Sequence, residues 1–84
     1  MKGLQIKAYE DKCHKQFRDI SLDWLLKYDL YEESDGSLLD HPRAYLDRGA
    51  SIFLAHLNDE IVGTVSINPI SSSVCEILTL GVVD

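Results

Sequence analysis

The last eleven residues, 74–84, constrain the fold more than any other part of the chain. From Val74 to Val83 the residues are almost all apolar, and the apolar ones fall on both alternating faces. A strand with one solvated face would alternate with polar residues, so this pattern predicts an interior strand over 74–83. A single carboxylate, Glu76, interrupts the pattern. Such a strand should be flanked on both sides by other parts of the fold.

The size and composition indicate one small soluble domain. The chain has 84 residues, of which 45% are hydrophobic and 26% charged. A chain this short buries only about 60–65% of its unfolded surface, so its stability margin is thin. No run of about 18 apolar residues predicts a membrane span, and residues 1–7 lack the apolar core of a signal peptide, which favours a cytoplasmic location. The net charge of −6 disfavours a nucleic-acid partner, because phosphate binding requires a basic patch.

The N-terminal part predicts a strand followed by a long helix. Residues 4–9 alternate between apolar and polar, as in a half-buried strand. Asp11 can cap the helix that we expect over about 12–28. Its predicted buried stripe has spacings of three and four and consists of Cys13, Phe17, Ile20, Trp24 and Tyr28. We expect Trp24 and Tyr28 to belong to the core.

The remaining segments predict one more helix and three strands. Residues 29–41 read as an acidic loop, and Pro42 begins a short helix over 42–48, capped by Asp40 or His41 and ended by Gly49. A β-hairpin follows, with strands at 52–57 and 60–68 and a turn at Asn58-Asp59. The order β-α-α-β-β-β predicts an α+β domain with a mainly antiparallel sheet. The strand 74–83 should be antiparallel to 60–68, and the chain offers it no second neighbour.

Two motifs resemble the GNAT superfamily of acyl-CoA-dependent N-acetyltransferases. The sequence Glu-Ile-x-x-Leu-Gly-Val-Val, from Glu76 to Val83, is similar to the fourth strand of that fold, and 59–63 is similar to its hairpin turn and third strand. The order and spacing of the elements match the family over the whole chain. Residues 1–84 therefore resemble the N-terminal portion of a single GNAT-like acetyltransferase domain. The sequence departs from the family pattern at Asp84, where it stops before the Gly-rich turn that holds the pyrophosphate of acetyl-CoA in the family.

The resemblance implies a set of site residues. Glu76 stands where several family members have a general base, and a carboxylate on an apolar strand face is expected to be desolvated and therefore more basic. The alternative is that Glu76 is exposed and structural. The backbone of Leu80, Gly81 and Val82 would bind the pantetheine arm and the thioester, with Gly81 suited to a bulge or a close approach. The resemblance also implies that the acidic segment covers the acceptor pocket and attracts a protonated amine. The alternative is that this segment is a solvated surface loop. Its residues are Asp29, Tyr31, Glu32 and Glu33.

These observations predict an acetyl-CoA-dependent transferase with an amine acceptor of unknown identity. We expect the isolated chain to bind acetyl-CoA weakly or not at all, and to be inactive. The alternative function is a non-catalytic interaction or homodimerisation module that uses the open edge of strand 74–83. Cys13 and Cys75 are predicted to be reduced, partly buried thiols, and the three histidines share no spacing typical of a zinc site.

Overall fold

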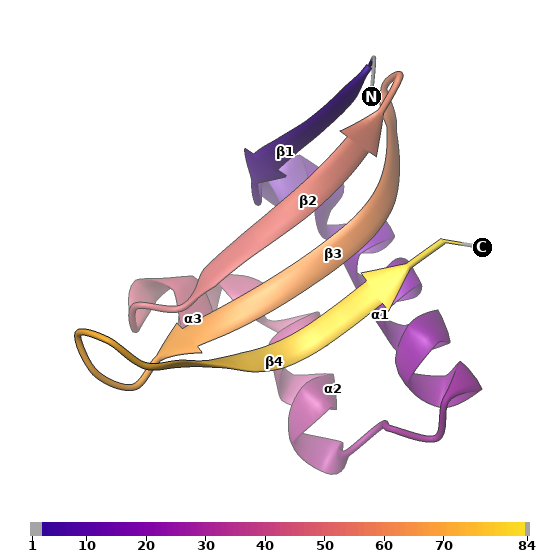
Figure 1. Ribbon diagram of the computed structural model, residues 1–84. Coiled ribbons are helices and arrows are strands. Elements are labelled where there is room, and N and C mark those ends of the chain that lie inside the picture. Colours follow the sequence, from indigo (N-terminus) through magenta and orange to yellow (C-terminus); the bar gives the residue numbers. More distant parts are fainter. Residues whose placement is uncertain (1–2, 84) are drawn as a thin grey trace.

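A computed structural model describes residues 3–83 of the chain and shows an α+β fold with a four-stranded sheet. Figure 1 shows the helices on one face of that sheet, with the other face open. The strands are β1 (Leu4–Ala8), β2 (Ser51–Leu57), β3 (Glu60–Pro69) and β4 (Cys75–Val82). A 3-10 turn (Asp11–Cys13) precedes the helices, which are α1 (His14–Lys27), α2 (Glu33–Asp40) and α3 (Pro42–Asp47). All three strand pairings are antiparallel, in the spatial order β1-β2-β3-β4.

The hairpin prediction is confirmed in its detail. Asn58 and Asp59 have φ angles of 51° and 75°, both in the left-handed region. A two-residue turn with two positive φ angles matches the right-handed twist of the flanking strands, and Asn and Asp tolerate that conformation. The predicted strand at 4–9, the short helix at 42–48 and the antiparallel pairing of 74–83 with 60–68 are also confirmed, with ends that differ by one or two residues. The predicted half-burial of the first strand is wrong, because all residues of β1 are exposed. Gly49 has a φ angle of 102° just after α3, as expected at a helix C-terminus.

The prediction that 29–41 is a loop is wrong, because this segment contains α2. Glu32 and Asp35 form a capping box, in which each side chain accepts a hydrogen bond from the backbone N–H of the other residue. Leu38 and Leu39 are buried, so packing against the core stabilises a helix whose first turn has weak helix formers. A Cβ at Gly36 would lie 2.5 Å from the hydroxyl of Tyr31, so a larger residue there would displace the exposed end of that side chain.

The predicted cap at Asp11 is also wrong. Asp11 lies within the 3-10 turn, and its carboxylate accepts a hydrogen bond of 2.9 Å from Arg43 in α3. The predicted caps at Asp40 and His41 do not form either, because the N-terminus of α3 has no side-chain hydrogen bond. The carboxylate of Asp40 instead pairs with Arg18 at 2.8 Å. Both carboxylates therefore join different helical segments through side-chain pairs.

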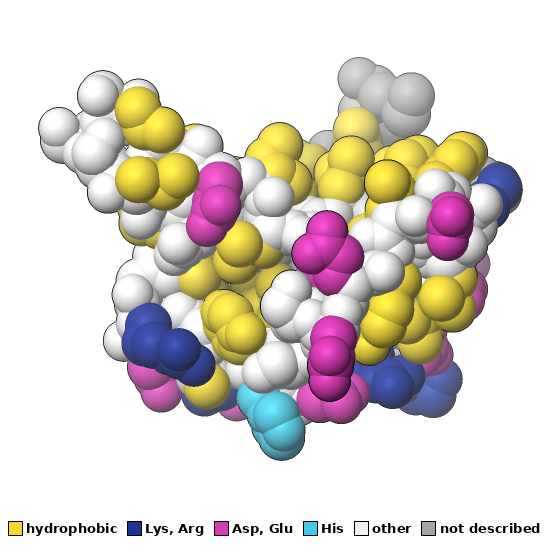
Figure 2. All heavy atoms as spheres, turned by 90° about the horizontal axis from the view of Figure 1, so that it is seen from below, with side chains coloured by type: hydrophobic (Ala, Val, Ile, Leu, Met, Phe, Trp, Pro, Cys, Tyr) yellow, Lys and Arg dark blue, Asp and Glu magenta, His cyan; other side chains and the backbone are white. Residues whose placement is uncertain are grey.

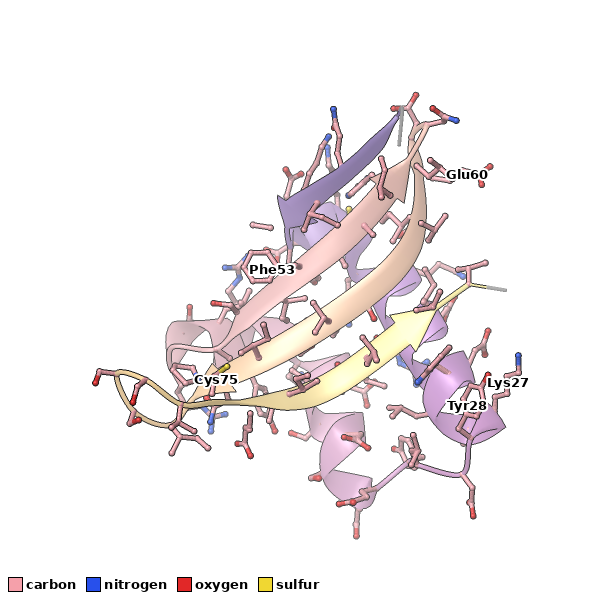
Figure 3. The ribbon with its side chains drawn as sticks, viewed as in Figure 1. Lys27, Tyr28, Phe53, Glu60 and Cys75 are labelled. Atoms are coloured by element: carbon pink, nitrogen blue, oxygen red, sulfur yellow. The ribbon has the colours of Figure 1, made fainter. Side chains whose placement is uncertain are left out.

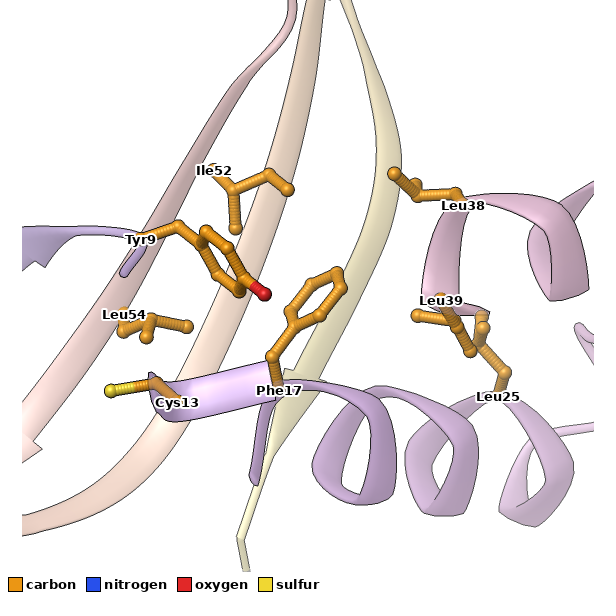
Figure 4. Packing of buried hydrophobic residues seen from close by; sticks show 8 residues of the cluster. All are labelled: Tyr9, Cys13, Phe17, Leu25, Leu38, Leu39, Ile52 and Leu54. Atoms are coloured by element: carbon orange, nitrogen blue, oxygen red, sulfur yellow. The ribbon is translucent and has the colours of Figure 1, made fainter. Parts of the chain in front are cut away.

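The core lies between α1, α2 and the sheet (Figure 4). The buried face of α1 follows a spacing of four and consists of Cys13, Phe17, Ser21 and Leu25. The predicted stripe is therefore right at Cys13 and Phe17 and wrong at its end, where Trp24 is partly buried and Tyr28 is 49% exposed. The stripe shifts because α1 crosses β4 near Ser21, where a small residue lets the helix approach closely.

Strand β4 lies at the edge of the described sheet, as expected for a strand to which the chain offers no second neighbour, and the flanking on both sides that its apolar pattern predicted is not found among residues 3–83. Its one neighbour among the described residues is β3. Thr79 and Gly81 face the helices and are buried, whereas Leu80 and Val82 are 41% and 50% exposed on the other face. Apolar residues on both faces arise here because one face packs against α1 and the other belongs to the open side of the sheet.

Two pairs of buried hydroxyl groups join α1, β3 and β4. Ser21 of α1 shares a hydrogen bond of 2.7 Å with Thr64 of β3, and the hydroxyl of Thr79 donates to that of Ser66 at 2.8 Å. Because unpaired hydroxyls are costly in a dry interface, these pairs favour one register of β4 and one position of α1.

Among residues 3–83, no helix is long and apolar enough to cross a bilayer. Both cysteines are free; Cys13 is buried, whereas Cys75, predicted to be partly buried, is exposed.

Candidate functional site

A hollow of about 510 Å³ lies beside β4 on the helical side of the sheet. Residues 76–80 of β4 form one side of the hollow. The other sides come from the C-terminal end of α1, the segment that follows it, α2 and α3. Its lining residues combine aromatic, aliphatic and acidic side chains: Trp24, Leu25, Leu30, Glu32, Ser34, Asp35, Leu38, Tyr45, Glu76, Ile77, Leu78, Thr79 and Leu80. A concave, mostly apolar surface with a few polar groups is the usual form of a small-molecule site.

Three carboxylates lie on the wall of this hollow, and no lysine or arginine among residues 3–83 does. Glu32 and Asp35 come from the N-terminus of α2, and Glu76 comes from β4. In the capping box, Asp35 accepts the backbone N–H of Glu32 at 2.8 Å, which holds this carboxylate in place. Figure 2 shows this side of the molecule, with acidic side chains among apolar ones. The local potential therefore favours a cation.

Glu76 is exposed, in contrast to the desolvated position expected from the apolar strand. Its carboxylate accepts a hydrogen bond of 3.3 Å from the side-chain amide of Asn68, which is its partner on β3. The strand begins at Cys75, so Glu76 lies near the end of the sheet, where α1 no longer covers it.

The outer edge of β4 presents unpaired backbone groups next to the hollow. The backbone N–H of Val83 donates to the carbonyl of Val62 at 2.8 Å, so this pair is hydrogen-bonded. Paired residues alternate along an antiparallel ladder, and the pairs Val82–Gly63 and Leu80–Val65 are therefore the non-hydrogen-bonded ones. The N–H and C=O groups of Leu80 and Val82 consequently point away from β3, toward the open edge.

The irregularity in β4 lies at Leu78 and not at Gly81, where a bulge was predicted. Thr79 pairs with Ser66 and Ile77 pairs with Ile67, which leaves Leu78 as the extra residue. Gly81 has a different role, because a Cβ there would lie 2.8 Å from the carbonyl oxygen of Ile20. The glycine allows the backbone of α1 to approach β4. The predicted close approach thus exists, but with a helix of the same chain.

The structure brings together part of the predicted site. Glu32, Glu76 and Leu80 lie on the wall of the hollow, and Gly81 and Val82 follow along the same strand. Asp29, Tyr31 and Glu33 are exposed and do not line it. Sequence reasoning missed Trp24, Asp35 and Tyr45. The sequence offered one usable signal, the Glu-x-x-Asp spacing of the capping box, whereas the aromatic residues are indistinguishable in sequence from core residues.

The histidines do not contribute to this hollow. His14 forms a hydrogen bond of 2.7 Å between its Nε2 and the carbonyl oxygen of Leu39, which joins α1 to α2. Within residues 3–83, no group of three or more histidine, cysteine or acidic side chains is arranged to hold a metal ion.

Comparison with known proteins identifies the fold. No protein-family model and no curated protein matches the sequence. A crystal structure of an acetyltransferase of the GNAT family from Staphylococcus aureus Mu50 matches the structure with a TM-score of 0.77 and 19% sequence identity. The match covers 96% of this chain and 53% of that chain, so the chain spans about half the length of the solved acetyltransferase. The likeness establishes a GNAT-like half-domain fold, as the sequence motifs predicted.

Proposed function

We propose that the chain is part of an acetyl-CoA-dependent N-acetyltransferase and contributes the acceptor pocket and the strand that orients the thioester. One observation carries this proposal: the unpaired backbone groups of Leu80 and Val82 lie on the same strand as Glu76, beside a hollow with an acidic wall. Backbone N–H groups at a sheet edge can bind the thioester carbonyl and stabilise the negative charge that develops on its oxygen. The GNAT-like fold supports the same assignment.

The proposed reaction is direct acetyl transfer to an amine. A protonated amine first loses one proton, through water, to Glu76. The neutral nitrogen then attacks the thioester carbon, the N–C bond forms, the C–S bond breaks, and coenzyme A leaves as its thiolate, which takes up the second proton that the nitrogen loses. Four residues of strand span at most about 13 Å, so a thioester at Leu80 is too distant for direct contact with Glu76, and the proton moves through bound water. The exposure of Glu76 is compatible with such a relay.

The acceptor would be a small molecule or peptide that carries a protonated amine. Glu32 and Asp35 on the wall favour a cation, and Trp24 and Tyr45 offer aromatic surface to its apolar part. We place this reaction in the cytoplasm. We expect the chain alone to bind acetyl-CoA weakly, because the cofactor is a polyanion and the chain carries a net charge of −6.

Nuclear magnetic resonance on the ¹⁵N-labelled chain tests the proposal. Acetyl-CoA at millimolar concentration should shift the amides of Leu80 and Val82, and a primary amine should shift the indole N–H of Trp24. Glu76→Gln and Glu32→Gln together should weaken the amine response and leave the acetyl-CoA response unchanged. Glu33→Gln serves as the matched control, because Glu33 does not line the hollow. Shifts confined to other regions, or none at all, would contradict the proposal.

The second candidate is a binding module that adds a strand from another chain to the edge of β4. The outward N–H and C=O groups of Leu80 and Val82 favour this candidate, because unpaired edge groups recruit extended segments. An extended peptide would then shift the edge amides, and Trp24 would not respond to amines.

A further inference from the structure

The first turn of α2 forms part of the wall of the hollow, and carboxylates of the chain itself occupy it. A helix N-terminus ordinarily attracts anions, because its backbone N–H groups are unpaired and its dipole is positive there. In α2 the N–H of Glu32 donates to Asp35 at 2.8 Å, and the N–H of Asp35 donates to the side chain of Glu32. The part of the wall that could bind the carboxylate of a ligand therefore presents two carboxylates instead.

The hollow also has two aromatic walls, Trp24 and Tyr45, each supported by a neighbour that does not line it. The ring centres of Trp24 and Tyr28 lie 4.6 Å apart, and the guanidinium of Arg48 lies 4.9 Å from the centre of the Tyr45 ring. These contacts restrict the motion of both rings. The hollow therefore offers a preformed surface to the apolar part of a ligand.

Basic side chains near the hollow are engaged outside it. Arg48 lies against Tyr45 and donates a hydrogen bond of 3.2 Å to the carbonyl oxygen of Ala44. Lys27 lies 5.5 Å from the centre of the Tyr28 ring, and Figure 3 shows both side chains at the C-terminal end of α1. Neither Arg48 nor Lys27 lines the hollow. The walls that residues 3–83 form thus hold carboxylates without a compensating cation.

We propose that the acceptor is a primary amine with an apolar body and with no carboxylate on the carbon that carries the nitrogen. This inference rests on the proposed function, because it names the substrate class of the same site. In an α-amino acid, the ammonium and carboxylate groups are bonded to one carbon. The carboxylates of the wall that attract the ammonium group therefore also repel the carboxylate beside it, at nearly the same distance.

The edge of β4 does not remove this repulsion. The outward N–H groups of Leu80 and Val82 could donate to the carboxylate of an amino acid. The proposed function assigns these donors to the thioester, however, so an amino acid bound there would compete with acetyl-CoA. An amine without a carboxylate leaves both groups to the thioester.

Two sources supply an amine of this class. Decarboxylation of an aromatic or aliphatic α-amino acid removes the carboxylate as carbon dioxide and leaves the free amine. In a peptide, the first residue keeps its amine, and its carboxylate has become a neutral amide. Both sources share the chemistry that the hollow favours, and the test contains one compound of each kind.

Three ligands with the same ring test the proposal at pH 6: phenethylamine, L-phenylalaninamide and L-phenylalanine. The shift of the indole N–H of Trp24, the only tryptophan, gives each dissociation constant in the ¹⁵N-labelled 84-residue chain. We expect phenethylamine and the amide to bind about tenfold or more tightly than phenylalanine, and this ratio to shrink in about 1 M salt, which screens the repulsion. The tighter of these two ligands identifies the source.

Two double variants locate the cause of the preference. Glu32→Gln with Glu76→Gln should reduce the ratio to about threefold or less, because it removes two carboxylates from the wall, while glutamine can still accept the capping hydrogen bond. Asp29→Asn with Glu33→Gln is the matched control. It removes the same charge at exposed positions that do not line the hollow, and should leave the ratio unchanged.

The outcomes separate this inference from the proposed function. Phenylalanine that binds as tightly as its amide, while acetyl-CoA still shifts the amides of Leu80 and Val82, would overturn only the substrate class. A preserved preference without any acetyl-CoA response would support the class and contradict the transferase. No response of Trp24 to any of the three ligands, or equal effects of the two double variants, would overturn the inference.

Discussion

Gly81 shows how a single residue sets the distance between two layers. Its missing side chain leaves room for the backbone of α1 at Ile20 and Ser21, so the helix lies closer to β4 than any other residue type would allow. The same approach brings Ser21 within hydrogen-bond distance of Thr64. The position of α1 determines in turn where Trp24 lies on the wall of the hollow.

We expect Gly81→Ala to destabilise the fold by about 1–3 kcal/mol, because the new Cβ would collide with backbone atoms that cannot rotate away. Gly63→Ala is the control on the neighbouring strand. A Cβ there meets its nearest atoms at 3.4 and 3.5 Å, which are ordinary contacts. Urea unfolding at low protein concentration, followed by circular dichroism, measures both. Equal effects in the two variants would show that the approach of α1 is not the cause.

The buried Ser21–Thr64 pair gives a second prediction at this scale. Ser21→Ala and Thr64→Val should each lower the free energy of unfolding by about 1–3 kcal/mol, since each leaves one buried hydroxyl without its partner. The double variant removes both hydroxyls and should lose less than the sum of the two. A double-mutant cycle from urea unfolding measures the difference, and strict additivity would mean that the hydroxyls do not interact.

At the scale of elements, α2 is joined to α1 by a charged pair on the surface. Arg18 and Asp40 approach to 2.8 Å. The hydrogen bond from Arg18, together with its positive charge, lowers the pKa of Asp40 below its ordinary value of 3.8. A carboxyl whose pKa is lowered by folding contributes stability above its unfolded pKa. That contribution is lost as the pH falls through the lower, folded value.

We expect Arg18→Gln to raise the pKa of Asp40 toward its ordinary value. The acid limb of the stability curve should then become shallower below about pH 4, because less stabilisation remains to be lost. Carboxyl-detected NMR titration measures the pKa directly. Arg43→Gln is the control, because Arg43 pairs with Asp11 instead. An unchanged Asp40 titration in Arg18→Gln would mean that the pair does not persist in solution.

At the scale of the whole molecule, β4 is shared by three surfaces. Its helical side borders the hollow, its open side belongs to the face of the sheet that the helices leave open, and its outer edge carries unpaired backbone groups. A substitution in β4 can therefore affect more than one function. Leu80→Lys, for example, would place a charge on the open side of the sheet as well as beside the edge.

The role of Glu76 is best tested in a chain that is extended by the remaining half of the matched acetyltransferase fold. If this fusion is active, Glu76→Gln should lower kcat for a primary amine by about 10²–10⁴, the range typical of general-base removal. The affinity for acetyl-CoA should stay the same, because the amide keeps the shape of the side chain. Release of the free thiol measures the rate, and Glu33→Gln is the control. Undiminished turnover would assign Glu76 a structural role.

Local patterns in the sequence were enough to predict most of the elements. The alternation in residues 60–68 and the Asn58-Asp59 pair predicted the hairpin, because turn conformation and strand alternation depend on neighbouring residues. Pro42 and Gly49 bracketed α3 for the same reason. The motif from Glu76 to Val83 indicated the fold, and the comparison confirmed it.

Tertiary structure decided the features that depend on contacts between distant segments. The helix α2 forms because Leu38 and Leu39 pack into the core, whereas its local signal is limited to the Glu-x-x-Asp spacing of its capping box. The buried side of α1 follows from its close crossing of β4 at Gly81. The acidic hollow requires α1, α2, α3 and β4 to converge, so Trp24 and Tyr45 could not be assigned to it in advance. Whether an apolar strand is interior or at an edge depends on how many strands pair with it. The residue pattern of a strand indicates which of its faces are buried, but it does not indicate whether both edges are paired.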